Sequence, residues 1–191
     1  MKLILASTSP YRRELLTRLG LEFEAVAPNT DETRLPGETP KQLVRRLAEA
    51  KARAVAKDFP AARIIGSDQV AVLGDRILGK PGDHATAVQQ LSAACGRRVT
   101  FLTGLCLYNS SSDQCQVDVV PYTVEFRALN AVQIENYLRR EQPYNCAGSF
   151  KSEGLGISLF RRMEGEDPNA LIGLPLIRLI DMLTAEGVNV L

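Results

Sequence analysis

The sequence predicts an α/β protein with a mixed, twisted sheet flanked by helices. Short apolar runs alternate with longer segments that carry apolar residues at helical spacing, which is typical of strand and helix repeats. Two hairpin-like segments interrupt this alternation, so antiparallel strands are expected beside parallel ones. The chain has 191 residues, of which 45% are hydrophobic and 24% charged. This is enough to bury the core of a single domain, residues 1–191, in two lobes.

The first predicted elements are a strand, a helix and a second strand. The apolar run at residues 3–5 predicts a buried strand, and residues 10–20 predict a helix that begins with proline and ends with glycine. The alternating segment 22–28 (EFEAVAP) predicts the second strand. Residues 28–38 are polar and contain proline and glycine, which indicates a loop.

A long helix and the middle of the sheet follow. Thr39 and Gln42 have the spacing of a capping box, so a helix is expected over residues 40–58. Residues 63–69 (RIIGSDQ) predict an inner strand. Residues 70–79 predict a hairpin with a Gly-Asp turn.

The second half of the chain continues this alternation. Its predicted elements are a helix from Asp83 to Gly96, strands over residues 97–109 and 116–126, a helix from Asn130 to about Arg140, a loop over residues 143–154, the segment ISLFRRME, and a last helix around residues 174–186. The polar segment SSSDQ separates the two strands, which favours an antiparallel pair.

Charge, hydropathy and cysteine content exclude several kinds of protein. The 23 basic and 22 acidic residues leave a net charge of +1, so long nucleic acid is not an expected partner. No segment has the length of a membrane span or a secretory h-region, so we expect a cytoplasmic protein without membrane contact. The four cysteines lack CxxC spacing, which argues against a zinc site or a redox pair.

The sequence also lacks the common catalytic and nucleotide-binding signatures. His84 is the only histidine and follows a predicted helix cap, so it is interpreted as a surface helix residue. Mechanisms that pair serine or cysteine with histidine are therefore not expected. Lys80 follows a glycine but precedes Pro81, which does not fit a Walker A loop, and no GxGxxG segment is present.

Two arginines occupy the first turn of the first predicted helix. The amino end of a helix carries partial positive charge, so Arg12 and Arg13 stand where cations are disfavoured. A bound anion would make their placement favourable.

Lys51 interrupts an apolar stripe. At about 100° per residue the apolar positions of the long helix fill an arc of about 140°, and Lys51 falls near its middle. The apolar positions are Leu43, Val44, Leu47, Ala48, Ala54 and Val55. The lysine either extends its ammonium past the edge of the core or points into a polar cleft.

Three further charged residues can each be interpreted as part of a binding site or as an ordinary surface charge. Asp68 lies at the carboxyl end of the predicted inner strand, where α/β proteins bind ligands, but it could equally be a turn carboxylate. Lys80 has the same status after its strand, and Glu32 could be a solvated loop charge. If the connections bring these residues to Arg12 and Lys51, the set suits a polyphosphate with a divalent metal.

Seven segments along the chain resemble one known family. They are ASTSPYRRELL, the DE pair at residues 31–32, the lysine in AEAKA, IIGSDQV, ILGKP, CAGSFKSEG and GLPL. In this order and spacing they resemble the Maf family of nucleoside triphosphate pyrophosphatases over essentially the whole chain. The resemblance implies a fold like that of the inosine triphosphate pyrophosphatases, with a central cleft, and hydrolysis of a nucleoside triphosphate to the monophosphate and pyrophosphate. It also implies a divalent metal cation, Mg²⁺ or Mn²⁺, and a homodimer.

The resemblance assigns roles to individual residues. Asp68 matches the catalytic acid/base of the family, and Glu32 together with Asp68 matches positions that hold the metal. The positions that face the phosphates are Ser7, Arg12, Arg13, Lys51 and Lys80.

Three positions distinguish branches of the family. The branch that acts on dTTP and UTP has arginine, threonine and glutamine where this chain has Tyr11, Gln69 and Glu153. The combination found here resembles the branch that acts on 7-methyl-GTP, although some relatives carry tryptophan at the position of Tyr11. Two alternatives remain open: a broader housecleaning pyrophosphatase for modified nucleotides, and a non-catalytic nucleotide-binding regulator of cell division.

Overall fold

The structure, a computed structural model, describes all 191 residues and divides into two compact units. Unit 1 comprises Met1–Gln69, Leu102–Val120 and Asp167–Leu191, and unit 2 comprises Val70–Phe101 and Pro121–Glu166. The strands form one seven-stranded sheet in the order β2-β1-β3-β5-β6-β7, and β4 pairs with β3. The predicted mixed α/β fold is confirmed.

Unit 1 is built around the amino-terminal strand. Strand β1 (Lys2–Ala6) pairs in parallel with β2 (Glu24–Val26) on one side and with β3 (Ala62–Leu73) on the other. Helices α1 (Pro10–Thr17) and α2 (Pro40–Ala56) connect these strands. Parallel neighbours need such crossover connections, which explains the alternation of strand and helix in this part of the sequence.

The remaining elements follow in chain order. They are β4 (Arg76–Leu78), α3 (His84–Ala94), β5 (Arg98–Asn109), β6 (Gln114–Phe126), α4 (Ala131–Glu141), the short 3₁₀ helices η1 (Ala147–Ser149) and η2 (Leu155–Leu159), β7 (Phe160–Gly165), α5 (Pro168–Ile172) and α6 (Leu176–Ala185). None of the helices is both long and apolar enough to cross a bilayer.

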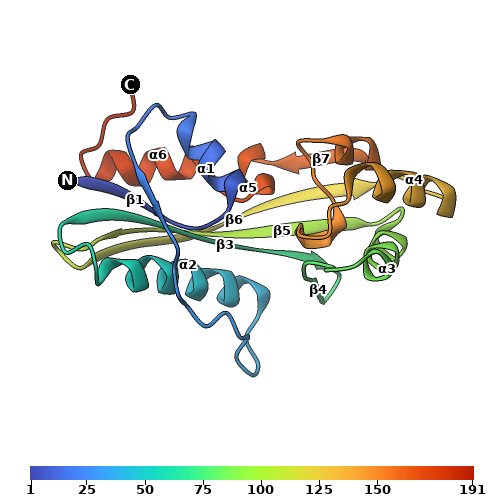
Figure 1. Cartoon of the computed structure of the whole chain (residues 1–191), viewed down its shortest axis with the longest axis horizontal. Coiled ribbons are helices and arrows are strands. Elements are labelled where there is room, and N and C mark those ends of the chain that lie inside the picture. Colours follow the sequence, from blue (N-terminus) through green and yellow to red (C-terminus); the bar gives the residue numbers. More distant parts are fainter. The chain divides into compact units, whose positions relative to one another are not determined.

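The sheet of unit 1 is covered on both faces, with α1 and α6 on one side and α2 on the other (Figure 1). Neighbouring residues of one strand point to opposite faces. Leu5 and Ile65 accordingly join the core beneath α1 and α6, whereas Ile4 and Ile64 join the core beneath α2. Burial on both faces explains why these strands read as continuous apolar runs.

Helix α2 lies against the sheet at two glycines. A Cβ atom on Gly66 would stand 2.0 Å from the carbonyl oxygen of Ala48, and one on Gly104 would stand 2.1 Å from that of Val44. Only glycine permits such an approach of helix backbone to strand backbone. The close packing brings the buried face of α2 to β3, including Lys51.

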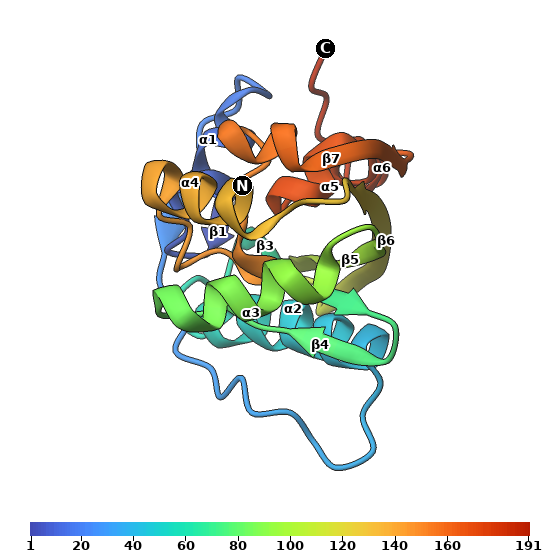
Figure 2. The same cartoon turned by 90° about the vertical axis from the view of Figure 1, so that its right-hand side faces the viewer.

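Unit 2 places α3 beside α4, as Figure 2 shows from one end. Phe150 packs edge-on against Phe101, Phe126 and Phe160 with ring centroids 4.8–5.7 Å apart. His84, the first residue of α3, is a surface helix residue as predicted, with 41% of its side chain exposed, and its ring nitrogens contact Tyr144 Oη at 2.9 Å and Glu135 Oε2 at 2.8 Å.

Two predicted boundaries were wrong, and one helix was missed. The strand expected to end at residue 69 runs on to Leu73, and β2 covers three residues instead of seven. The predicted last helix is α6, but the short helix α5 before it, which ends at Gly173 with a φ of 125°, was not predicted. Asp167 joins α5 to α6: its Oδ1 accepts from Asn169 N in α5 and its Oδ2 from Ile177 N in α6, each at 2.8 Å.

One cysteine contact was not anticipated by the spacing of the thiols. Cys106 and Cys115, on the two strands that flank the SSSDQ turn, have their Sγ atoms 3.5 Å apart.

Candidate active site

The predicted site residues of unit 1 gather where β1 and β2 end. Ala6, the last residue of β1, pairs with Val26, the last residue of β2, and with Gly66 of β3. Beyond this edge β3 continues without its neighbour β1, so Asp68 lies inside a strand but past the end of the adjacent one. The prediction that Asp68 ends its strand was wrong, but its place at the carboxyl edge of parallel strands was right.

The alternation of β3 sorts its polar residues onto two faces. Ile64 and Gly66 face α2, so Asp68, two residues further, faces α2 as well. Ser67 and Gln69 point the other way, toward α5 and the turn that follows it.

Asp68 and Lys51 form a buried ion pair that Glu32 joins. Lys51 Nζ lies 2.7 Å from Asp68 Oδ1 and 2.8 Å from Glu32 Oε1. The exposed fractions of the side chains are 7% for Lys51, 11% for Asp68 and 60% for Glu32. Lys51 therefore does not extend its ammonium into solvent but pairs it with the two carboxylates.

Burial perturbs the acid of this cluster. The pKa of Asp68 is raised, chiefly because burial disfavours its charged form, and the nearby charge of Glu32 adds to the rise. Lys51 and Arg12 act in the opposite direction. A carboxyl held between these influences can take up or release a proton nearer to neutral pH than an exposed aspartate.

Arg12 approaches the same cluster from the amino end of α1. Ser9 caps this helix by accepting from the backbone N–H of Arg12, and Arg12 Nε donates to the carbonyl oxygen of Gly173 at 2.8 Å. The pKa of Arg12 is lowered by burial, while Asp68 and Glu32 raise it. The half-buried guanidinium is thus fixed next to the acids, whereas Arg13 on the same turn is exposed.

Ser7 lies between β1 and α1. It is buried, and its Oγ accepts from the backbone N–H of Ser9 at 3.1 Å. Ser7 thereby shapes the turn that leads from the strand into the helix. Tyr11, in the first turn of α1, is half-buried.

Glu38 was missed by the sequence analysis, although it fixes the loop that carries Glu32. Its carboxylate accepts from Arg46 Nε at 2.7 Å and Nη2 at 2.9 Å, and from Leu35 N at 3.1 Å. The hydrogen bonds from Arg46 are the main reason why the pKa of Glu38 falls to about 2. This two-point contact ties the loop to α2.

Ser67 and Gln69 hold the carboxyl-terminal segment at the site. Ser67 Oγ, which is fully buried, donates to the carbonyl oxygen of Gly173, the same oxygen that Arg12 uses. Gln69 Nε2 donates to the carbonyl oxygens of Ala170 and Leu171 at 2.7 and 3.1 Å. The amide nitrogen of Gln69 therefore bonds to the protein itself. In the sequence, only the GLPL motif, which begins at Gly173, indicated that this carboxyl-terminal segment lies at the site.

Two predicted site residues belong to unit 2. Lys80 follows β4, and Glu153 lies in the loop before η2, and both are exposed. The hydroxyl of Ser152 donates to Glu153 Oε2 at 3.2 Å.

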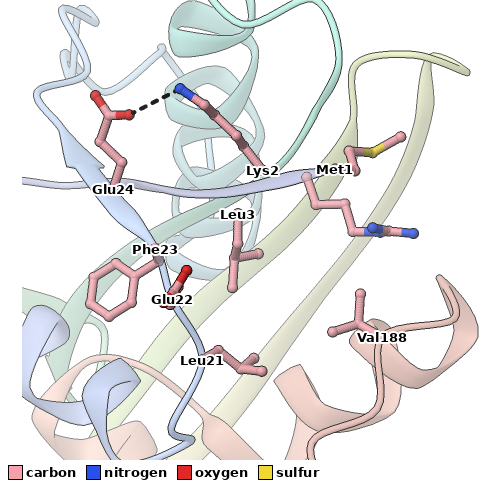
Figure 3. A pocket seen from close by; sticks show the side chains of 9 residues that line it. Met1, Lys2, Leu3, Leu21, Glu22, Phe23, Glu24 and Val188 are labelled. Carbon is pink, nitrogen blue, oxygen red and sulfur yellow. Dashed lines mark ion pairs between the residues drawn. The ribbon is translucent and has the colours of Figure 1, made fainter.

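A pocket of about 630 Å³ lies elsewhere in unit 1, beside the amino end of β1 (Figure 3). Leu3, Leu21 and Val188 line it together with a Lys2–Glu24 ion pair of 3.9 Å. It contains none of the predicted site residues, and those of unit 1 gather at the other end of β1.

Glu32 and Asp68 could hold a divalent metal. Glu32 Oε1 and Asp68 Oδ1 both contact the Lys51 nitrogen, so the two carboxylates lie close together, with the ammonium of Lys51 at the point between these two oxygens. No group of three or more His, Cys, Asp or Glu side chains could hold a metal ion. Mg²⁺ is commonly bound by one or two carboxylates with substrate phosphates completing its shell, so this pair fits.

Comparison with known proteins identifies the family. The family model described as "Maf-like protein" matches residues 2–186. The chain belongs to the Maf family. Two curated relatives, both named 7-methyl-GTP pyrophosphatase, come from Pseudomonas syringae pv. tomato and Nitrosococcus oceani. They are 62% and 60% identical, over 98% and 99% of this chain and 98% and 95% of their own lengths.

Solved structures support the fold of this Maf protein. The Ham1 proteins of Staphylococcus aureus and Coxiella burnetii both superpose with a TM-score of 0.55 over 97% of this chain and 100% and 99% of theirs. Their sequence identities of 15% and 16% make this a likeness of fold alone.

Proposed function

We propose that this Maf protein hydrolyses 7-methyl-GTP to 7-methyl-GMP and pyrophosphate. The observation that carries the proposal is the buried Lys51–Asp68 ion pair, which the exposed Glu32 joins, at the carboxyl edge of parallel strands. A buried ion pair contributes little net stability because its desolvation offsets its attraction, so its presence suggests a functional reason. Two relatives at about 60% identity over nearly their whole length carry the name of this activity.

The proposed reaction is attack of water on the α-phosphorus, with pyrophosphate as leaving group. Asp68 acts as the general base that accepts the proton of the water, since its pKa is raised toward the working range. Lys51 orients the carboxylate of Asp68 and offers a cation to the phosphate oxygens. A divalent metal held by Glu32 and Asp68 would add positive charge against the charge that accumulates on the phosphates.

The triphosphate is bound by cations and by the amino end of α1. The N–H groups of the first helical turn and the guanidinium of Arg12 form an anion-binding end, with Ser7 in the preceding turn. Arg13 and Lys80 contribute two further cations, since they match positions that face the phosphates in the motifs of the family. A triphosphate is therefore the anion that accounts for two arginines at a helix amino end.

Base selectivity is assigned to Tyr11 and Glu153. Methylation at N7 gives guanine a delocalised positive charge, which an aromatic face attracts. A carboxylate complements this charge and accepts hydrogen bonds from the N1–H and the amino group of guanine. Gln69 contributes indirectly, since its amide holds α5.

The test is a panel of canonical and methylated nucleoside triphosphates assayed with Mg²⁺ or Mn²⁺ and with separate detection of pyrophosphate and orthophosphate. We expect pyrophosphate as the first product, dependence on the metal, and a kcat/KM for 7-methyl-GTP about tenfold or more above that for GTP. Release of orthophosphate would refute the reaction, and equal kcat/KM for both nucleotides would refute the substrate. Binding of nucleotide without turnover would favour the non-catalytic regulator of cell division. Turnover of many modified nucleotides would favour the broader housecleaning pyrophosphatase.

Asp68→Asn tests the base. The amide keeps the size of the side chain but cannot accept a proton, so kcat should fall about 10²-fold or more. Asp58→Asn, at an exposed position after α2, is the matched control and should keep wild-type kcat. Wild-type turnover by Asp68→Asn would contradict the assignment.

We also infer that the protein acts as a homodimer, as the family resemblance suggests. Light scattering distinguishes this from a monomer of 20.9 kDa.

A further inference from the structure

Two side chains of α4 hold the loop that carries Glu153. The backbone N–H of Lys151 donates to Tyr137 Oη at 3.0 Å, and that of Leu155 donates to Glu141 Oε2 at 2.7 Å. The two bonds lie two residues before and two residues after Glu153. The loop is therefore fixed to one helix on both sides of the residue to which base recognition is assigned.

The backbone of this loop is tightly closed, and glycine is needed at position 156. The N–H groups of Gly154 and Gly156 both donate to the carbonyl oxygen of Lys151, at 3.2 and 3.0 Å. A Cβ on Gly156 would stand 2.2 Å from that oxygen, and one on Gly154 would stand 2.7 Å from Glu141 Oε1. The carboxylate of Glu141 is thus pressed against the loop.

Tyr137 and Glu141, the two anchors of the loop, lie on one face of α4. Tyr137 and Glu141 are four residues apart, so their side chains project from the same side of α4. Tyr137 is buried, and burial is the main cause of its raised pKa, to which the nearby charges of Glu141 and Glu153 also contribute. A capping box formed by Asn130 and Gln133 holds the start of the helix.

We propose that Tyr137 and Glu141 are positioning residues that set base selectivity by fixing Glu153. The proposal rests on the proposed function, because it requires that Glu153 recognise the methylated base. A binding carboxylate must be held within about 0.5 Å of its productive position, and Glu153 is itself exposed on a loop. Loss of an anchor lets this carboxylate move while the phosphate-binding residues of unit 1 stay unchanged.

The variants are Tyr137→Phe, which removes only the hydroxyl, and Glu141→Ala, which removes the carboxylate. We expect each to reduce the preference for 7-methyl-GTP over GTP about fivefold, the effect of one lost hydrogen bond, through a higher KM for 7-methyl-GTP. The kcat for GTP should stay at the wild-type value. Glu141→Gln keeps an acceptor for Leu155 N and should restore most of the preference, and Arg140→Ala, exposed on the same helix, should change nothing.

Hydrogen exchange of the amides of Lys151 and Leu155 gives a readout independent of activity. Exchange should become faster at Lys151 in Tyr137→Phe and at Leu155 in Glu141→Ala. If these amides exchange at the wild-type rate, or if selectivity persists while they exchange faster, the inference is overturned and the proposed function stands. If the wild type itself shows no preference for 7-methyl-GTP, the proposed substrate is refuted. The role of Tyr137 and Glu141 in selectivity is then refuted as well. Tyr137→Phe decides the matter even if Glu141→Ala fails to fold.

Discussion

Lys51 shows at the scale of one residue how the site departs from the demands of stability. A lysine on the buried face of α2 gives up its hydration, and only Asp68 and Glu32 compensate for this loss. An apolar residue of similar length would fill the same space without that cost. We propose that the lysine is retained because it controls the protonation and placement of Asp68.

Replacing Lys51 by methionine should shift the pH dependence of catalysis. Lys51 lowers the pKa of Asp68 against the effect of burial, so its removal should raise that pKa further. The base works only when ionised, and activity is lost as the pH falls through its pKa. The acid limb of kcat/KM should therefore move to higher pH, together with a lower maximal rate. The measurement is the pH profile of kcat/KM for both proteins.

Lys41→Met, in the first turn of the same helix, is the matched control because Lys41 is exposed. An unshifted acid limb in Lys51→Met would show that the ion pair does not govern the base. The variant should also lose thermal stability, because Asp68 stays buried without the cation that compensates its charge.

The loop between β2 and α2 is the element whose order depends most clearly on one carboxylate. The pKa of Glu38 falls from 4.5 to about 2 in the folded protein, mainly through its hydrogen bonds with Arg46. A lowered pKa contributes stability that is present above pH 4.5 and lost as the pH falls toward 2. The contact between Glu38 and Arg46, which holds the loop that carries Glu32, should therefore be lost under acid conditions.

Glu38→Gln tests this contribution. We expect a lower Tm than wild type near neutral pH, and a difference that shrinks as the pH is lowered from 4.5 toward 2. Thermal melts followed by circular dichroism over that range measure it. Glu22→Gln, at an exposed position, should alter Tm little throughout. A Tm difference that does not depend on pH would mean that Glu38 stabilises the loop by some means other than its charge.

The contact of α2 with β3 is the packing feature that brings Lys51 to Asp68. Gly66→Ala would place a methyl group 2.0 Å from Ala48 O, so the helix backbone must move away. We expect a loss of about 1–3 kcal/mol of unfolding free energy from such overpacking. Turnover should fall as well, because the distance between Lys51 and Asp68 changes.

Denaturant unfolding and steady-state kinetics measure the two effects of Gly66→Ala. Gly79→Ala is the control for stability, since nothing lies within 4 Å of the added methyl group. Wild-type stability in Gly66→Ala would show that the helix tolerates a wider spacing than the structure has.

At the scale of the whole molecule, the near balance of charge limits the partners. With a net charge of +1, attraction to phosphate is confined to local clusters such as the amino end of α1. A short polyphosphate can use such a cluster, whereas long nucleic acid requires a row of cations.

We therefore expect no measurable binding of a fluorescent DNA duplex at about 0.15 M salt in an anisotropy titration. The same protein should bind a nucleoside triphosphate under those conditions. Tight duplex binding that weakens steeply with salt would contradict the prediction.

Local signals in the sequence were sufficient for most elements. Thr39, Asp83 and Asn130 each cap a helix through a side-chain bond to the backbone, at the helix starts that the sequence predicted. A cap acts within one turn of its own helix, so neighbouring residues contain all the information it needs. A boundary was wrong where a distant partner decided it, as for β3, and the short helix α5, which Asp167 caps and joins to α6, was missed.

The amino-acid sequence by itself determined which residues break their local pattern: Arg12 at a helix amino end, Lys51 in an apolar stripe and Asp68 after an apolar run. It left two readings for Lys51 and Asp68, because the free energy of a charge depends on what surrounds it. Only the tertiary structure decided where these side chains lie, by packing α2 on Gly66 so that Lys51 and Asp68 meet at 2.7 Å. Glu38 and Ser67 were invisible beforehand for the same reason, since a hydrogen bond between distant segments leaves no periodic trace in the sequence.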